Sequence, residues 1–88
     1  MDNIQAALLI PQVKKIEKQW RARERIAQIY RRAFSKLEID MPHEYANSKH
    51  GRHIFPIWVN PKKRDKILEY INNNGVGAVI NYPAIHLF

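Results

Sequence analysis

The sequence contains no cysteine, which excludes a disulfide framework and any metal site built on thiolates. It also lacks a long apolar run: the longest, Ala6 to Pro11, is far shorter than the roughly 20 residues that span a bilayer. The N-terminus does not show the basic and then apolar order of a signal peptide. With 88 residues, the chain can form one small domain at most. These features predict a soluble, cytoplasmic protein without a membrane partner.

The net charge of +7 is unevenly distributed along the chain. Residues 1–36 contain nine Lys and Arg against three Asp and Glu, whereas residues 37–88 contain six against five. The basic excess therefore lies in the first part of the chain. Such asymmetry favours an anionic partner, which could be nucleic acid, a phosphate group or an acidic protein surface.

Residues 1–37 are predicted to form one long helix, regular from residue 3 to about residue 35. Asp2 or Asn3 can serve as its N-cap. Pro11 has no N–H and clashes with the preceding turn, so the helix is expected to be kinked or broken there. Apolar side chains recur mostly three or four positions apart and predict one buried face; they are Ile4, Leu8, Val13, Ile16, Trp20, Ala27, Tyr30, Phe34 and Leu37. The other face is basic, with Lys14, Lys15, Lys18, Arg21, Arg25, Arg31 and Arg32.

Residues 38–52 lack periodicity and are predicted to be a loop. Residues 53–59 are rich in β-branched and aromatic side chains and predict a strand, which Pro56 confines to a sheet edge or a bulge. Asn60 and Pro61 predict a helix start, and Gly75 predicts its end in the left-handed conformation. Residues 76–80 predict a second strand.

The predicted fold class is therefore α+β. A long helix, a loop, a strand, a helix and a strand follow one another, with a small sheet packed on the helices. Residues 53–88 form a β-α-β unit in this prediction, and residues 1–88 form a single partial domain.

No residue pattern predicts catalysis or metal binding by this chain. The four histidines, His43, His50, His53 and His86, do not lie at the spacing of metal ligands, which favours hydrogen-bonded or exposed histidines. Ser35 and Ser48 are not accompanied by His and Asp in an order along the chain that would indicate a catalytic triad. The glycines at 75 and 77 follow a predicted helix rather than precede one, so they do not form a phosphate cradle.

The basic helix allows an alternative function, a small module that binds nucleic acid or another protein. Trp20 and Tyr30 lie among the arginines and could stack on bases. Both, however, fall on the apolar face, which favours packing against protein over nucleic-acid binding.

Several motifs resemble those of one enzyme family in their order along the chain. They are Met1–Leu9 with Gln12–Ile16, the stretch from Arg21 to Tyr30, His53–Phe55, Arg64–Asp65, Gly75–Gly77, and Asn81–Leu87. Together they resemble the DegT/DnrJ/StrS-type sugar aminotransferases over nearly the whole chain, except the loop at 38–50. Many members carry His where this chain has Asn81.

The resemblance implies a fold-type-I enzyme that uses pyridoxal phosphate (PLP) to move an amino group, usually from glutamate, onto a keto-sugar attached to a nucleotide. In the family the lysine that binds PLP lies before the stretch that resembles Met1. The chain is therefore expected to be a C-terminal small-domain fragment, which is inactive and binds no cofactor by itself. A homo-oligomer through the N-terminal helix is also expected.

The resemblance further implies which residues line the nucleotide-sugar pocket. Tyr82 and His86 are the first candidates, and Asn81 is the third. A phenol and an imidazole can both donate hydrogen bonds to a diphosphate or a sugar hydroxyl at neutral pH. No catalytic, cofactor-binding or metal-binding residue is expected.

Overall fold

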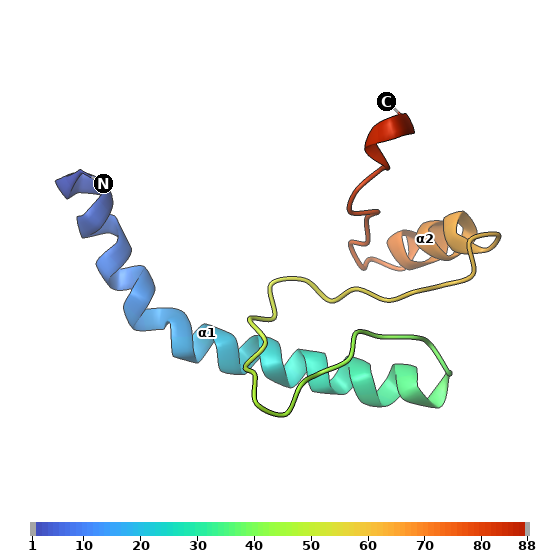
Figure 1. Cartoon of the computed structure of the whole chain (residues 1–88), viewed down its shortest axis with the longest axis horizontal. Coiled ribbons are helices and arrows are strands. Elements are labelled where there is room, and N and C mark those ends of the chain that lie inside the picture. The colour runs from blue at the N-terminus through green and yellow to red at the C-terminus, as the bar shows by residue number, and fades with distance from the viewer. Residues whose placement is uncertain (1, 88) are drawn as a thin grey trace. The chain divides into compact units, whose positions relative to one another are not determined.

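A computed structural model describes residues 2–87 and contains two compact units, Met1–Trp58 and Val59–Phe88. The first unit holds helix α1 (Asn3–Lys36); the second holds helix α2 (Arg64–Asn73) and the short 3₁₀ helix η1 (Ile85–Leu87) (Figure 1). The outer ends of the predicted helix and of the predicted β-α-β unit, Met1 and Phe88, lie outside the described residues. Neither α-helix of the described chain combines the length and the apolar character that a membrane span requires.

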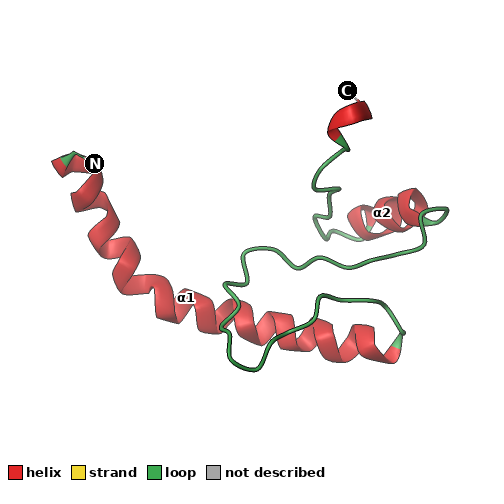
Figure 2. Cartoon of the chain, viewed as in Figure 1, coloured by secondary structure: helices red, strands yellow, loops and turns green. Residues whose placement is uncertain are grey.

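The predicted α+β fold is wrong for residues 2–87, which are helical and contain no β-strand (Figure 2). The first predicted strand, residues 53–59, makes a single antiparallel bridge, in which the Trp58 N–H donates to the Asp40 carbonyl at 3.0 Å. Pro56 has no N–H to give to a ladder. One bridge does not make a sheet, because a strand needs a neighbour along its whole length.

The second predicted strand, residues 76–80, has no regular secondary structure, and the backbone of Ala78 within it finds a local partner instead. The Asn72 side chain accepts from the Ala78 N–H at 2.9 Å and donates to the Ala78 carbonyl at 3.1 Å. This amide takes the place that a neighbouring strand would occupy. The apolar composition of both segments therefore predicted a strand that the contacts do not support.

Helix α1 begins as the sequence predicts and continues through Pro11 without a break. The Asp2 carboxylate accepts the Gln5 N–H at 2.7 Å, which identifies Asp2 as the N-cap. The sequence predicts a kink or a break at Pro11, and the break does not occur. Figure 1 shows that the axis of α1 bends along its N-terminal part.

The C-terminus of α1 turns the chain back along the helix. The Ile39 N–H donates to the Phe34 carbonyl and the Glu38 N–H to the Ser35 carbonyl, at 3.1 and 3.3 Å. This pair of bonds forms a Schellman motif, in which Glu38 adopts a left-handed φ of 55°. The reversal places residues 39–58 against the C-terminal half of α1, and there the first unit is packed.

Contacts with residues 39–58 give the C-terminal half of α1 its limited core. Ala27 is the one buried residue among residues 2–87, with 4% of its surface exposed. The Phe55 ring meets Tyr30 edge-on at 5.3 Å between centroids and lies 6.1 Å from Phe34. Aromatic pairs at such distances add to the apolar burial. The N-terminal half of α1 has no such cover in its own unit, and its apolar side chains are exposed.

In the second unit, α2 begins later than predicted. Asn60 caps a turn instead of the helix: its side chain accepts the Lys62 N–H at 2.9 Å, and α2 begins at Arg64. The predicted end is confirmed, because Gly75 has a φ of 83° in a Schellman motif closed by the Val76 N–H on the Ile71 carbonyl.

Candidate functional site

The three predicted substrate-binding residues follow α2 in the second unit, and all three are exposed. His86 lies within η1, which the Leu87 N–H closes on the Ala84 carbonyl at 2.9 Å. Tyr82 is 84% exposed. Within residues 2–87, the side chains of Asn81, Tyr82 and His86 make no hydrogen bond, so their polar groups are free for a ligand. Their role in substrate binding stays a prediction.

The most tightly packed polar group of the chain lies in the first unit and centres on Arg52. The Arg52 side chain is 8% exposed, and its guanidinium donates to both oxygens of Glu24, in the middle of α1. It also forms an ion pair with Glu44 of the loop. Arg31 of α1 lies 3.6 Å from Glu44 and donates to the Pro42 carbonyl at 3.2 Å. We call Glu24, Arg31, Glu44 and Arg52 the ion-pair cluster.

The charges of the ion-pair cluster balance, and each carboxylate is held ionised. The hydrogen bond from Arg52 lowers the pKa of Glu24 below its ordinary value, and the same guanidinium lowers the pKa of Glu44. The two carboxylates in turn raise the pKa of Arg52. Arg52 adopts a left-handed φ of 54°, a conformation that costs a non-glycine residue on the order of 1 kcal/mol. The ion pairs therefore offset local backbone strain.

The lowered pKa values predict an acid-sensitive first unit. Carboxylates whose folded pKa is depressed stabilise the fold fully above their ordinary pKa of 4.5, and this contribution is lost as the pH falls through the depressed values. The contribution of these two carboxylates to the thermal stability should therefore be complete above about pH 5 and should be lost progressively below about pH 4.5. Circular dichroism melts over this range measure it. A Glu24→Gln/Glu44→Gln variant should lose most of the dependence, and an equally steep decline in that variant would contradict the assignment.

A second set of contacts fixes the loop next to the ion-pair cluster. The Trp20 indole N–H donates to the His50 carbonyl at 2.6 Å, and the Lys49 ammonium lies 4.0 Å from the centroid of the Trp20 ring. Lys49 also donates to Glu17 at 3.0 Å, which lowers the pKa of that carboxyl. Trp20 therefore uses one ring face and its N–H within the chain, which favours packing against protein over stacking on bases.

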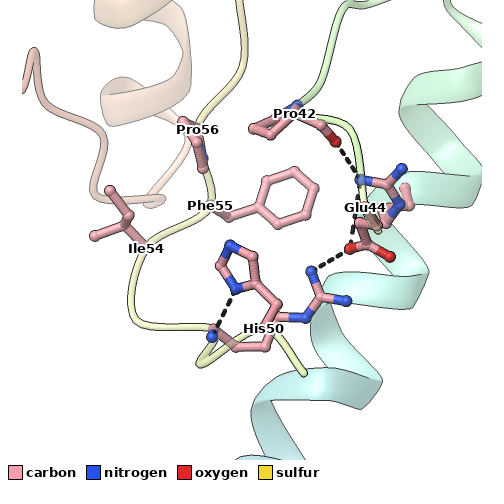
Figure 3. A pocket seen from close by; sticks show the side chains of 8 residues that line it. Pro42, Glu44, His50, Ile54, Phe55 and Pro56 are labelled. Atoms are coloured by element: carbon pink, nitrogen blue, oxygen red, sulfur yellow. Dashed lines mark hydrogen bonds and ion pairs between the residues drawn. The ribbon is translucent and has the colours of Figure 1, made fainter. Parts of the chain in front are cut away.

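Two hollows border the ion-pair cluster. The smaller has a volume of about 10 Å³, room for about one water, and is lined by Arg31, Pro42, Glu44, His50, Arg52, Ile54, Phe55 and Pro56 (Figure 3). The larger, of about 460 Å³, is open and extends past Trp20, Tyr45 and Lys49. The carboxylates that border them are already paired with guanidinium groups, so they offer no free acid or base. The ion-pair cluster therefore holds the loop, through Glu44 and Arg52, on helix α1.

The described residues contain no group of side chains that could hold a metal ion: among residues 2–87, no three His, Asp or Glu side chains lie close enough together. His50 Nδ1 accepts the Arg52 N–H at 2.9 Å, and the His43 ring lies edge-on to Tyr45. These two histidines are engaged in local contacts of the loop.

The residues present do not fit the pocket that PLP requires. A lysine that binds PLP must be enclosed with a free amine, and an acidic residue must hold the pyridine nitrogen. All eight lysines are exposed, and Lys49, which lines the larger hollow, forms an ion pair with Glu17. No step through the cofactor is therefore assigned to residues of this chain.

The sequence reasoning missed the ion-pair cluster, although a signal was present. It placed Arg31 on the exposed basic face, whereas the structure places it half-buried under the loop. Glu24 and Arg31 share a helix face with Trp20, Ala27 and Phe34, because they lie three or four positions apart. Charged residues on an apolar face require partners, and this requirement could have identified both.

Comparison with known proteins identifies one family and one uncharacterized relative. The sequence model of the DegT/DnrJ/EryC1/StrS aminotransferase family matches residues 1–88. The chain is 33% identical over 92 residues to the uncharacterized protein MJ1066 of Methanocaldococcus jannaschii, a match that covers 99% of this chain and 24% of that relative. The chain thus spans about a quarter of the length of its curated relative. No solved structure gives a significant match.

Proposed function

The chain belongs to the DegT/DnrJ/EryC1/StrS aminotransferase family, and we propose that it is the small-domain part of an enzyme that moves an amino group from glutamate onto a keto-sugar attached to a nucleotide. The family match over residues 1–88 is the observation that supports this proposal. Enzymes of this family use PLP, which supplies the electron sink for amino transfer. The groups that bind PLP are proposed to lie outside residues 1–88.

In this proposal the chain contributes to substrate binding through the segment after α2. Tyr82 and His86 donate hydrogen bonds to the diphosphate or to hydroxyl groups of the nucleotide-sugar, and Asn81 adds a third polar contact. The exposure of the three side chains and their lack of partners within residues 2–87 support this role.

The proposal extends to assembly and location. We propose a homo-oligomer with contacts through α1, which the exposed apolar side chains of that helix support. We also propose a cytoplasmic location, where nucleotide-linked sugars are available as substrates.

A chimera tests the proposed function. The stretch of MJ1066 that aligns with this chain is replaced by residues 1–88. The chimera should bind PLP, with a saturable change in absorbance, and transfer nitrogen from glutamate to a member of a panel of nucleotide-linked keto-sugars. The isolated 88-residue chain should show neither property. Saturable PLP binding by the isolated chain, abolished by substitution of one lysine, would refute the proposal that the groups that bind PLP lie outside residues 1–88.

Tyr82→Phe in the chimera should raise the KM for the nucleotide-sugar about 10-fold, because one hydrogen bond to a charged group is lost. The kcat and the PLP absorbance should remain close to those of the unmodified chimera, since Tyr82 is proposed to contact only the substrate. Steady-state kinetics measure both parameters. Tyr70→Phe is the matched control, because Tyr70 is 70% exposed but lies within α2. Equal KM values for the two variants would remove Tyr82 from the site.

A further inference from the structure

The N-terminal part of α1 carries apolar side chains that its own unit leaves uncovered. We define residues 3–16 as the N-terminal apolar segment. Leu8, Ile10 and Val13 are 66%, 57% and 60% exposed, and Ile4, Leu9 and Ile16 are exposed as well. The contrast lies within one helix, because residues 39–58 already cover one face of the C-terminal half, where Ala27 is buried.

Apart from Lys14 and Lys15 near its end, the N-terminal apolar segment also lacks the charges of a solvent-exposed helix. Residues 3–13 contain no Lys, Arg, Asp or Glu, although the whole chain contains 23 such residues. Leu9, Val13 and Ile16 continue the face that the loop covers further along α1, whereas Ile4, Leu8 and Ile10 point to other sides. A helix that is apolar on several sides is typical of a buried element. One flat neighbour cannot cover it.

We propose that the N-terminal apolar segment is a docking surface that is enclosed by the remainder of a full-length aminotransferase polypeptide. This inference rests on the proposed function, because the occupant is the part of the relative that lies outside the match. The match takes up 24% of MJ1066, so most of that protein is available to surround the segment. The occupant is an apolar concave surface without charged groups at its centre.

A second copy of the chain is a poorer occupant of the same surface. Residues 3–16 of a helix span about 21 Å at a rise of 1.5 Å per residue. Two such segments packed side by side bury much less than the ~1,200 Å² of a stable interface. They would also leave the opposite sides of both helices exposed to water. The homo-oligomer proposed above would use α1 beyond this segment, where Ile26 is 51% exposed.

Hydrogen exchange in the MJ1066 chimera tests the docking surface independently of activity. In the dilute, monomeric 88-residue chain, the amides of residues 3–16 should exchange faster than those of residues 20–34. In the chimera, residues 3–16 should exchange at least about 100-fold more slowly than in the isolated chain. Residues 20–34 should change less, because the loop already covers one face there.

Charge insertion provides a matched pair of variants. Ile10→Glu should lower the protection of residues 3–16 in the chimera at least about 10-fold, because it places a charge in an enclosed apolar site. Ile29→Glu is the control, since Ile29 lies in the same helix and is 53% exposed, yet it is outside the segment. Val13→Glu repeats the test at a second position. Circular dichroism of the isolated chains checks that each variant remains helical.

Four results would overturn the proposal. Residues 3–16 could exchange as fast in the chimera as in the isolated chain, which includes a chimera that does not fold. The isolated monomer could already protect them, so that its own later residues are the occupant. A dimer of the isolated chain could protect them as strongly as the chimera does, so that a second copy is the occupant. Ile10→Glu and Ile29→Glu could act equally. Slow exchange in a chimera without amino transfer would instead retain the surface and reject the proposed function.

Discussion

Replacing Arg52 with Met should destabilise the first unit by about 2 kcal/mol. The substitution removes the hydrogen bonds and ion pairs that Arg52 makes with Glu24 and Glu44, and it leaves two carboxylates close together without their shared cation. Removing one partner of a charged hydrogen bond costs about 1.5–3 kcal/mol. The lower half of this range applies, because the two carboxylates are 25% and 31% exposed and water can solvate them in part.

Met is the appropriate replacement because it keeps the length of the apolar stem and retains a Cβ. The left-handed φ of Arg52 therefore remains equally unfavourable in both proteins, and the difference reports on the guanidinium. Urea unfolding followed by tryptophan fluorescence measures the change, since Trp20 lies beside the loop that Arg52 holds. The unfolding midpoint should move to lower urea concentration.

Arg21→Met is the matched control for the Arg52 variant. Arg21 pairs with Glu17 at 3.5 Å on the surface of α1, where the two side chains are 71% and 55% exposed. Such exposed pairs contribute about 0–1 kcal/mol, so the midpoint should hardly move. If both variants shifted the midpoint equally, the ion-pair cluster would have no special role in holding the loop on α1.

The helices could be predicted from sequence because their signals are local. Asp2 caps α1 through a contact three residues away, and Gly75 ends α2 through its own backbone conformation. The strands could not, because a strand is defined by a neighbour that composition does not reveal. At residues 76–80 the Asn72 side chain satisfied the backbone of Ala78, a contact that β-propensity does not anticipate.

The predicted substrate-binding residues and the ion-pair cluster also differ in how far the sequence alone could predict them. Tyr82 and His86 could be proposed from sequence only through a resemblance, because isolated exposed residues carry no geometric signal of their own. The ion-pair cluster depends on Arg52, which lies 28 residues from Glu24 and approaches α1 only because the chain reverses at Glu38. Sequence could indicate that Glu24 and Arg31 required partners, but the reversal decides which residues those partners are.

The apolar counterpart of the ion-pair cluster is the contact between Phe55 and α1, and Phe55→Ala should destabilise the first unit by about 2 kcal/mol. The ring meets Tyr30 edge-on and lies 6.1 Å from Phe34. Truncation of a fully buried Phe costs about 3–5 kcal/mol. Phe55 is half-buried, so part of this loss is avoided. The same urea titration measures the effect.

Ile54→Ala is the control for Phe55→Ala, because Ile54 is the preceding residue and is 51% exposed. Its truncation should cost less than about 1 kcal/mol, since its side chain keeps most of its contact with water. If Phe55→Ala cost no more than Ile54→Ala, the aromatic contact would not hold the loop. A double variant of Phe55 and Arg52 should then separate the two contributions: both groups fix the same loop, so their effects should be less than additive if either loss alone releases it from α1.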